Sequence, residues 1–152
     1  MLMIVALLFV AVLAAGVLVK RRNDQDQLEK HSITPEDLHR LLASHRDVTL
    51  FDVRLPLDLL ANSVIIPGAT RLAPEEVIAN PALIPKERDL VVYCTCPSDK
   101  TSRVVLRQAL AMGFLRIKFL KGGLEAWQAM GYPVERYDKP FHLSASSAAL
   151  SL

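Results

Sequence analysis

The chain has 152 residues, 51% of them hydrophobic, and a formal net charge of +2. This length suits one compact domain with an appendage. The charge is too close to zero for the basic surface that binds a phosphate backbone, so we expect no nucleic acid partner.

The first segment, residues 1–19, contains no charged side chain. A helix of that length reaches about 28 Å, close to the hydrocarbon core of a bilayer at about 30 Å. The segment therefore predicts a membrane-spanning anchor. A cleaved signal peptide is the alternative, but its basic residues would precede the apolar stretch, whereas Lys20, Arg21 and Arg22 follow it. Because basic residues favour the cytoplasmic side, the pattern predicts a single-pass membrane protein with a cytoplasmic domain.

A linker and a helix are expected next. Residues 20–31 are polar from Asn23 onward and show no periodicity, which is typical of a short linker. Residues 32–46 predict a helix, because Thr34 suits its cap, Pro35 suits its first turn and leucines recur on one face.

The following strand, predicted at residues 48–53, ends at a charged pair. Its carboxyl end delivers Asp52 and Arg54 to a loop. The pair either serves a functional site or fastens the loop through a salt bridge. We assign both residues a supporting role at the site.

The rest of the chain alternates between strand and helix signals. The predicted elements are a short helical or irregular stretch at 56–62, a turn at Pro67 and Gly68, a helix start near Pro74, a buried strand at 90–93, a helix after Thr101 or Ser102, a strand at 116–120 and a helix at 124–130. Residues 138–152 predict a flexible tail, although their leucines also suit a docking segment. The alternation predicts an α/β fold with a mainly parallel sheet and helices on both faces.

Cys94 follows the buried strand directly and lies in a loop that leads to a helix. In open parallel sheets, ligands bind beyond the carboxyl ends of the strands. The unpaired N–H groups at the start of a helix favour an anion, which lowers the pKa of a thiol placed there. Lys100 acts in the same direction, whereas Asp99 and Pro97 act against it, so the sequence leaves the net shift open. Cys94 is the candidate nucleophile.

Four motifs together indicate a family. They are FDVR at 51–54, IPGA at 66–69, VVYC at 91–94 and LKGGLEAWQAMGYPV at 120–134. With these motifs the chain resembles a rhodanese-like (sulfurtransferase) domain over about residues 33–135, and we place the domain at 32–137. The resemblance implies that Cys94 takes sulfane sulfur from a small donor such as thiosulfate, holds it as a persulfide and passes it to a thiophilic acceptor. It implies no cofactor and no metal.

The loop after Cys94 departs from the family pattern. A typical loop reads C-x-x-G-x-R-[ST], whereas this one reads CTCPSDKTS. The residues assigned to substrate or anion binding are Thr95, Cys96, Pro97, Ser98, Asp99, Lys100 and Thr101. The spacing is similar to the longer loop of phosphatase relatives, but Lys100 is a point charge and lacks the planar fork with which Arg clamps a phosphate. We therefore rank phosphatase activity low.

One residue separates Cys96 from Cys94. Cys96 either resolves a persulfide or sulfenic acid as a strained disulfide, or has no role in the loop. The two thiols do not indicate a metal site, because no histidine has ligand-like spacing beside them. On the predicted helix at 124–130, Trp127 and Leu124 are either substrate contacts or, as an apolar helical stripe usually is, part of the core.

The sequence thus predicts a membrane-anchored sulfurtransferase that acts through a Cys94 persulfide. The missing loop Gly and Arg leave a catalytically weak or inactive binding or regulatory module as an alternative. A redox switch formed by Cys94 and Cys96 is another. The sequence does not name a protein partner.

Overall fold

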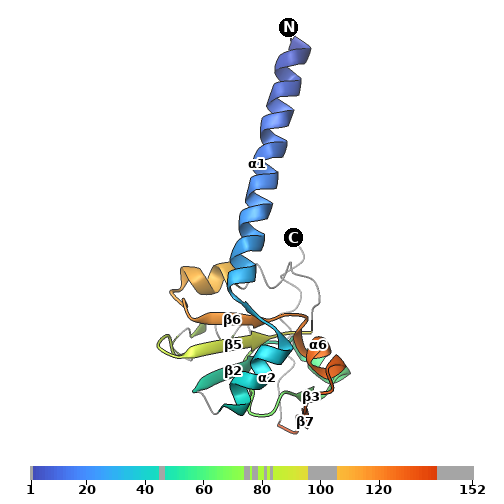
Figure 1. Ribbon diagram of the computed structural model, residues 1–152, viewed down its shortest axis with the longest axis vertical. Helices are drawn as coiled ribbons and strands as arrows, with labels where there is room; N and C mark the ends of the chain where they lie inside the picture. Colours follow the sequence, from blue (N-terminus) through green and yellow to red (C-terminus); the bar gives the residue numbers. More distant parts are fainter. Residues whose placement is uncertain are drawn as a thin grey trace.

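The computed structural model describes residues 2–44, 47–73, 76, 79–80, 82, 84–95 and 106–139. The helices include α1 (Leu2–Lys30), α2 (Pro35–Ala43), α3 (Pro56–Ala61), a helical segment at 106–111 and α6 (Gly123–Ala129). The strands are β1 (Ser32–Ile33), β2 (Val48–Asp52), β3 (Val64–Ile65), β4 (Thr70–Arg71), β5 (Asp89–Tyr93), β6 (Ile117–Leu120) and β7 (Glu135–Arg136). Figure 1 shows a layered domain from which α1 projects as a long helix.

A five-stranded sheet in the order β1-β6-β5-β2-β4 forms the centre of the domain. Every neighbouring pair in this sheet is parallel. β5 lies in the middle, between β2 and β6, while β3 and β7 form a separate antiparallel pair. The predicted α/β class with a mainly parallel sheet is therefore confirmed.

Two apolar clusters cover the two faces of the sheet. The Phe114 cluster contains Phe51, Leu72, Ile84, Leu90, Val92, Leu106, Ala109, Phe114, Ile117 and Phe119. The Trp127 cluster contains Ile33, Leu38, Leu50, Ile66, Val91, Tyr93, Leu120, Leu124 and Trp127. β5 contributes to both clusters because its side chains alternate between the faces, which is why its sequence is apolar throughout.

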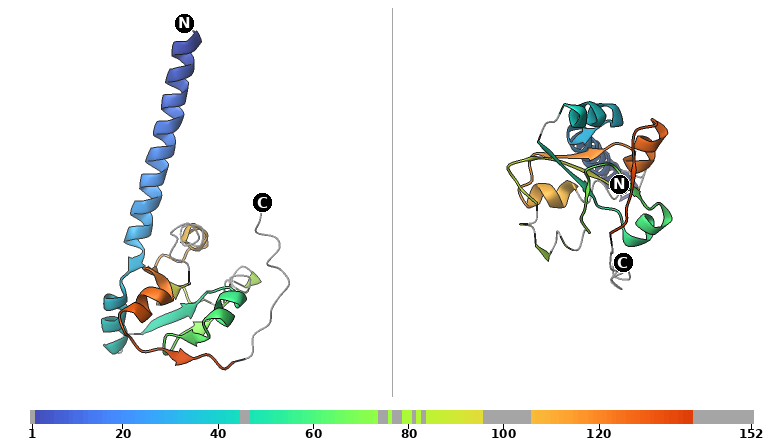
Figure 2. Two further views of the ribbon diagram at one scale, coloured as in Figure 1. Left: turned by 90° about the vertical axis from the view of Figure 1, so that its right-hand side faces the viewer. Right: turned by 90° about the horizontal axis from the view of Figure 1, so that it is seen from below.

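The helices lie on both faces of the sheet, as predicted. The segment at 106–111 contributes Leu106 and Ala109 to the Phe114 cluster. On the other face, α2 contributes Leu38 and α6 contributes Leu124 and Trp127 to the Trp127 cluster. Figure 2 shows the sheet between these two layers.

α2 begins where the sequence predicts. The hydroxyl of Thr34 accepts a hydrogen bond from the amide of Asp37 at 3.2 Å, and Pro35 occupies the first turn. One turn later, Leu38 is fully buried against the sheet. The cap therefore sets the point at which the apolar face of α2 meets the core.

α1 continues well beyond the apolar segment and ends only at Lys30. The predicted linker at 20–31 is therefore helical over most of its length. The contacts of its last turns with the domain are Leu28 on the Phe114 cluster, Asp24 with Arg107 at 3.5 Å, and Glu29 with Lys121. These contacts explain why a polar, aperiodic stretch stays helical here.

The prediction of a membrane-spanning anchor at residues 1–19 is not supported. Within the described residues, no helix combines the length and the apolar character that a bilayer crossing requires. α1 joins the apolar stretch to the charged residues from Lys20 to Lys30 in one helix. The predicted location, a single-pass membrane protein with a cytoplasmic domain, is contradicted by the same finding.

Four short strands are not predicted by the sequence. β1, β3, β4 and β7 contain two residues each, which is too short for an alternating pattern to appear. Residues 140–152 of the predicted tail lie outside the described residues. The prediction of a flexible or docking tail therefore stays a prediction.

Candidate functional site

The carboxyl ends of three neighbouring strands form one edge of the sheet. Asp52 at the end of β2 is in register with Tyr93 at the end of β5 and with Arg71 at the end of β4. The amide of Val53 still donates to the carbonyl of Tyr93 at 3.0 Å, so the pairing of β2 and β5 extends one residue beyond the strands. Cys94 follows Tyr93 and lies at this edge, as predicted, and the residue is half-buried.

The start of α6 holds the backbone of Cys94. The amide of Leu124 donates a hydrogen bond to the carbonyl of Cys94 at 3.1 Å. A Cβ atom added to Gly123 would lie 1.9 Å from the same carbonyl oxygen, and the φ angle of Gly123 is +57°. Both conditions require glycine. The KGG sequence before α6 therefore fixes the position of the Cys94 backbone.

Asp52 and Arg54 form a fully buried salt bridge, with no exposed surface on either side chain. The guanidinium donates to the carboxylate from Nε at 2.9 Å to Oδ1 and from Nη2 at 2.6 Å to Oδ2. The backbone amide of Arg54 adds a third donor at 3.0 Å. A buried pair of this kind is held by its mutual geometry, because either charge alone would be costly to bury.

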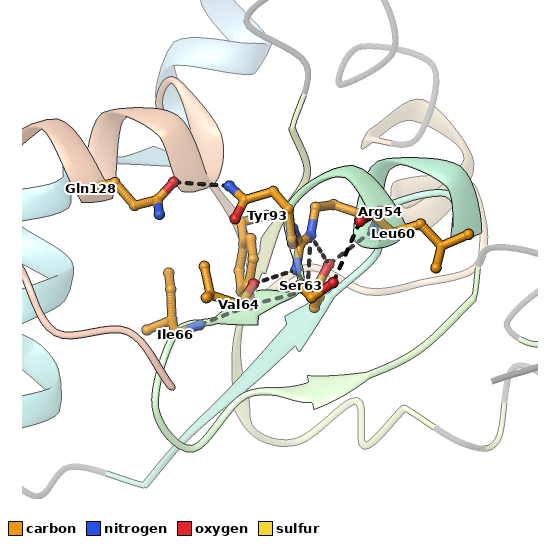
Figure 3. A network of polar contacts seen from close by, with 9 residues as sticks. Arg54, Leu60, Ser63, Val64, Ile66, Tyr93 and Gln128 are labelled. Carbon is orange, nitrogen blue, oxygen red and sulfur yellow. Dashed lines mark hydrogen bonds and ion pairs between the residues drawn. The ribbon is translucent and has the colours of Figure 1, made fainter. Parts of the chain in front are cut away.

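The remaining donors of Arg54 fasten the loop that follows β2. Nη1 donates to the carbonyl of Asn62 at 2.8 Å, and Nη2 donates to the carbonyl of Val64 at 2.7 Å. Figure 3 shows Arg54 at the centre of this network. The loop-fastening interpretation of the charged pair therefore agrees with the observed contacts, since the pair ties the segment after α3 to the end of β2.

Tyr93 extends the network toward the IPGA turn. Its hydroxyl donates to Oδ2 of Asp52 at 3.2 Å and accepts a hydrogen bond from the amide of Ile66 at 3.2 Å. Burial, followed by the negative charge of Asp52, raises the pKa of Tyr93 far above its ordinary value, so the phenol is a neutral hydrogen-bond donor. The hydrogen bonds of its side chain thus fix the position of Tyr93, the residue directly before Cys94.

Trp127 and Leu124 belong to the core. Trp127 is 1% exposed, and its indole N–H donates to the carbonyl of Pro133 at 2.8 Å. Leu124 is fully buried in the Trp127 cluster. The core interpretation of this apolar stripe is confirmed, and the two side chains are not exposed to a substrate.

A groove of about 580 Å³ lies beside the end of α1, between β1, β6 and α2. It is lined by side chains such as Glu29, Asp37, Arg40 and Lys121. Cys94 is not among the residues that line it. The groove is therefore separate from the candidate site, which is identified by the position of Cys94.

Only part of the predicted site falls within the described residues. Cys94, Thr95, Asp52 and Arg54 are described, and all of them lie at or next to the carboxyl edge of the sheet. The predicted loop residues outside the described set are Cys96, Pro97, Ser98, Asp99, Lys100 and Thr101. The anion-binding loop and the role of Cys96 therefore stay predictions. Over the described ranges, no group of three or more His, Cys, Asp or Glu side chains is arranged to hold a metal ion.

Sequence reasoning missed Arg71 and the polar role of Tyr93. Arg71 ends a strand of only two residues, which is too short for a sequence pattern to predict. The available signal is its position two residues after the IPGA motif. Tyr93 reads as one more apolar residue of a buried strand, yet a buried tyrosine usually needs a partner for its hydroxyl. That requirement points to a polar neighbour such as Asp52.

Comparisons with known proteins agree with this architecture. A model of the rhodanese-like domain family matches residues 34–130. A sulfurtransferase from Allochromatium vinosum is 33% identical over 104 residues, which cover 68% of this chain and 94% of that protein. The crystal structure of the Alr3790 protein from Anabaena sp. is similar with a TM-score of 0.56 and 31% identity, covering 70% of this chain and 83% of the other.

A larger relative contains only one part that corresponds to this chain. The probable adenylyltransferase/sulfurtransferase MoeZ from Mycobacterium tuberculosis is 34% identical over 115 residues. The matched region covers 73% of this chain but 28% of MoeZ. The similarity therefore concerns the domain built around the sheet and does not extend to the rest of MoeZ.

Proposed function

The chain belongs to the rhodanese-like domain family, and on this premise we propose that it is a sulfurtransferase in which Cys94 is the nucleophile. The observation that carries the proposal is the placement of Cys94, a half-buried residue, directly beyond the central strand β5, at the carboxyl edge where parallel sheets bind ligands. The relative named as a sulfurtransferase matches over nearly its whole length, which supports the same reaction type.

The proposed reaction proceeds in two displacement steps. The Cys94 thiolate attacks the outer sulfur of a sulfane donor such as thiosulfate. A new S–S bond forms to Cys94, the old S–S bond breaks, and sulfite leaves with the electron pair. A thiophilic acceptor then attacks the outer sulfur of the persulfide, which restores the Cys94 thiolate. The reaction needs no organic cofactor and no metal.

The described residues serve this reaction by positioning the thiol. The amide of Leu124 holds the carbonyl of Cys94 in place, and Gly123 leaves room for that carbonyl because it has no side chain. Tyr93, the residue directly before Cys94, is held by its hydrogen bond to Asp52. We infer that main-chain N–H groups of residues 95, 96 and 98–101, together with Lys100, stabilise the anionic thiolate and persulfide. A fixed nucleophile and fixed donors lower the cost of reorganisation during transfer.

The intact mass of the full chain after incubation with thiosulfate tests the proposal. The wild type should gain one sulfur atom, which cyanide removes as thiocyanate. Cys94→Ser should gain none, and Cys96→Ser, which removes the neighbouring thiol, should gain sulfur as the wild type does. No gain on the wild type with any sulfane donor, or an equal gain in Cys94→Ser, would refute the proposal.

A binding or regulatory module is the second candidate, and the loop sequence CTCPSDKTS favours it because the Gly and Arg of the typical family loop are missing. A partner that is captured equally by the wild type and by Cys94→Ser, with no sulfur transfer, would support this candidate. A redox switch is separate from both. It requires a disulfide between Cys94 and Cys96 after mild peroxide treatment, and oxidation of one thiol alone would exclude it.

A further inference from the structure

Arg71 carries two buried hydrogen-bond donors for which the described part of the chain provides no partner. Its Nε and Nη1 atoms are buried, and within the part of the chain that the structure describes neither has a hydrogen-bond partner. Buried polar groups are almost always paired, and a buried cationic donor without a partner is especially costly. A guanidinium in this state suits a site that takes an anionic ligand.

The neighbouring carboxylate does not neutralise Arg71. Asp52 is in register with Arg71 on the adjacent strand, so the two side chains leave the sheet on the same face. The oxygens of Asp52, however, already accept hydrogen bonds from Arg54 and from the hydroxyl of Tyr93. Among the described residues, Asp52 therefore makes its hydrogen bonds with Arg54 and Tyr93 and none with Arg71.

A second unsatisfied group lies at the same edge of the sheet. The hydroxyl oxygen of Thr95, the residue after Cys94, is buried and also has no hydrogen-bond partner within the described residues. Neighbouring strands lie about 4.8 Å apart, so the end of β4 is roughly 10 Å from the end of β5 across β2. The long side chain of Arg71 and a small anion together have the length to bridge this distance between the ends of β4 and β5.

We propose that Arg71 binds the oxyanion end of the sulfur donor, a sulfonate-type group such as that of thiosulfate, with the Thr95 hydroxyl as a second donor. This inference rests on the proposed function and names the substrate class of the same site. The planar guanidinium donates in parallel to two oxygens of such a group, which orients the outer sulfur toward Cys94. The same contact stabilises the charge that the departing sulfite gains when the S–S bond breaks.

Binding of thiosulfate to the full chain carrying Cys94→Ser tests the inference without turnover. Calorimetric titration should give an affinity that falls about tenfold or more when Arg71→Met is added, because a charge-assisted hydrogen bond is lost. Arg71→Lys should lose less, since it keeps the charge but not the fork, and Thr95→Val should also weaken binding. Arg136→Met, which makes the same exchange at an exposed position of β7, should leave the affinity unchanged.

Thermal unfolding separates a ligand-binding role from a structural one. Because Nε and Nη1 of Arg71 have no hydrogen-bond partner among the described residues, Arg71→Met should unfold at the same or a higher temperature than the parent Cys94→Ser chain. Added thiosulfate should raise the unfolding temperature of the parent but not that of Arg71→Met. Equal thiosulfate affinity with Met or Arg at position 71, or an equal loss in Arg136→Met, would overturn the inference.

Measuring sulfur transfer from a charged and an uncharged donor separates a failure of the Arg71 anion site from a failure of the proposed sulfurtransferase. In the Cys94 chain, Arg71→Met should raise KM for thiosulfate. The reaction of Cys94 with an uncharged organic trisulfide, in which attack on the central sulfur forms a mixed trisulfide on Cys94 and releases the organic thiolate, should be retained. If the wild type takes sulfur from both donors and Arg71→Met leaves the thiosulfate KM unchanged, the anion site is refuted and the transferase stands. If no donor delivers sulfur but thiosulfate binding still depends on Arg71, the transferase is refuted and the anion site stands.

Discussion

The amide of Leu124 lies 3.1 Å from the carbonyl oxygen of Cys94, so the first turn of α6 is attached to the residue that follows the central strand. Gly123 makes this approach possible, since a Cβ atom there would overlap the same oxygen at 1.9 Å. The position of the candidate nucleophile therefore depends on a contact between two segments about thirty residues apart in the sequence.

Gly123→Ala should displace Cys94. A left-handed backbone costs a non-glycine residue about 1–2 kcal/mol, and the overlap with the Cys94 carbonyl adds to this cost. Gly131→Ala is the matched control, because Gly131 has a φ angle of +71° but nothing within 4 Å of an added Cβ. Urea unfolding and the rate of Cys94 alkylation should both change more in Gly123→Ala. Equal effects in the two variants would contradict the close-approach argument.

Breaking the Asp52–Arg54 pair should destabilise the fold strongly. Arg54→Met leaves the Asp52 charge buried without its guanidinium partner, and such a loss costs about 3–5 kcal/mol in free energy of unfolding. Arg88→Met is the control, because the Arg88–Asp47 pair is exposed on both sides and such pairs contribute about 0–1 kcal/mol. Chemical denaturation measures both variants. A loss in Arg54→Met no larger than that in Arg88→Met would disprove the structural role of the buried pair.

Tyr93→Phe should lower stability by about 1–3 kcal/mol. The substitution removes the hydroxyl that joins Asp52 to the amide of Ile66, and leaves that buried amide without its acceptor. Tyr132→Phe serves as a comparison, because Tyr132 lies in a ring stack with His39 and Trp127 and keeps most of its contact area as Phe. Denaturation curves in which the two variants lose equal stability would argue against the bridging role of the Tyr93 hydroxyl.

The same tyrosine predicts an alkaline loss of stability. Because burial raises the pKa of Tyr93 above that of the unfolded chain, the folded state holds its proton more tightly. Its stabilising contribution is complete below the ordinary tyrosine pKa of about 10 and is lost as the pH rises beyond it. The free energy of unfolding should fall less steeply above this pH in Tyr93→Phe than in the wild type. Parallel pH profiles would contradict the assignment.

Thr34→Ala should cost about 1 kcal/mol, because the N-cap acceptor for the Asp37 amide is lost at the start of α2. Thr34→Ser keeps the hydroxyl and should unfold close to the wild type. Thermal unfolding of the two variants measures the difference. If alanine and serine give the same curve, the cap does not contribute to the stability of α2.

The elements that could be predicted are those with a local sequence signal. The strand at 90–93 is buried on both faces and is therefore apolar throughout, and the start of α2 is marked by the cap residue Thr34 and by Pro35. The charged pair at the end of β2 was also identified, although its fastening role through Asn62 and Val64 depends on contacts that no local pattern encodes.

The failures have physical causes as well. The apolar stretch at the start of the chain was interpreted alone, whereas α1 includes the polar residues that follow, and its last turns are held by partners distant in sequence. Arg71 was overlooked because its strand has two residues, and because the missing partners of its Nε and Nη1 atoms among the described residues appear only when the sheet is assembled. The surroundings of the last turns of α1 and of Arg71 depend on tertiary contacts, which periodicity does not encode.

The single tryptophan of the chain sits on α6, three residues after the amide that binds Cys94, and its ring is sealed in the core with its N–H bonded to Pro133. Intrinsic fluorescence of Trp127 therefore reports on α6, the helix whose Leu124 amide binds the carbonyl of Cys94. Any ligand or sulfur atom that loosens this helix would register as a change in emission, with no label attached to the protein.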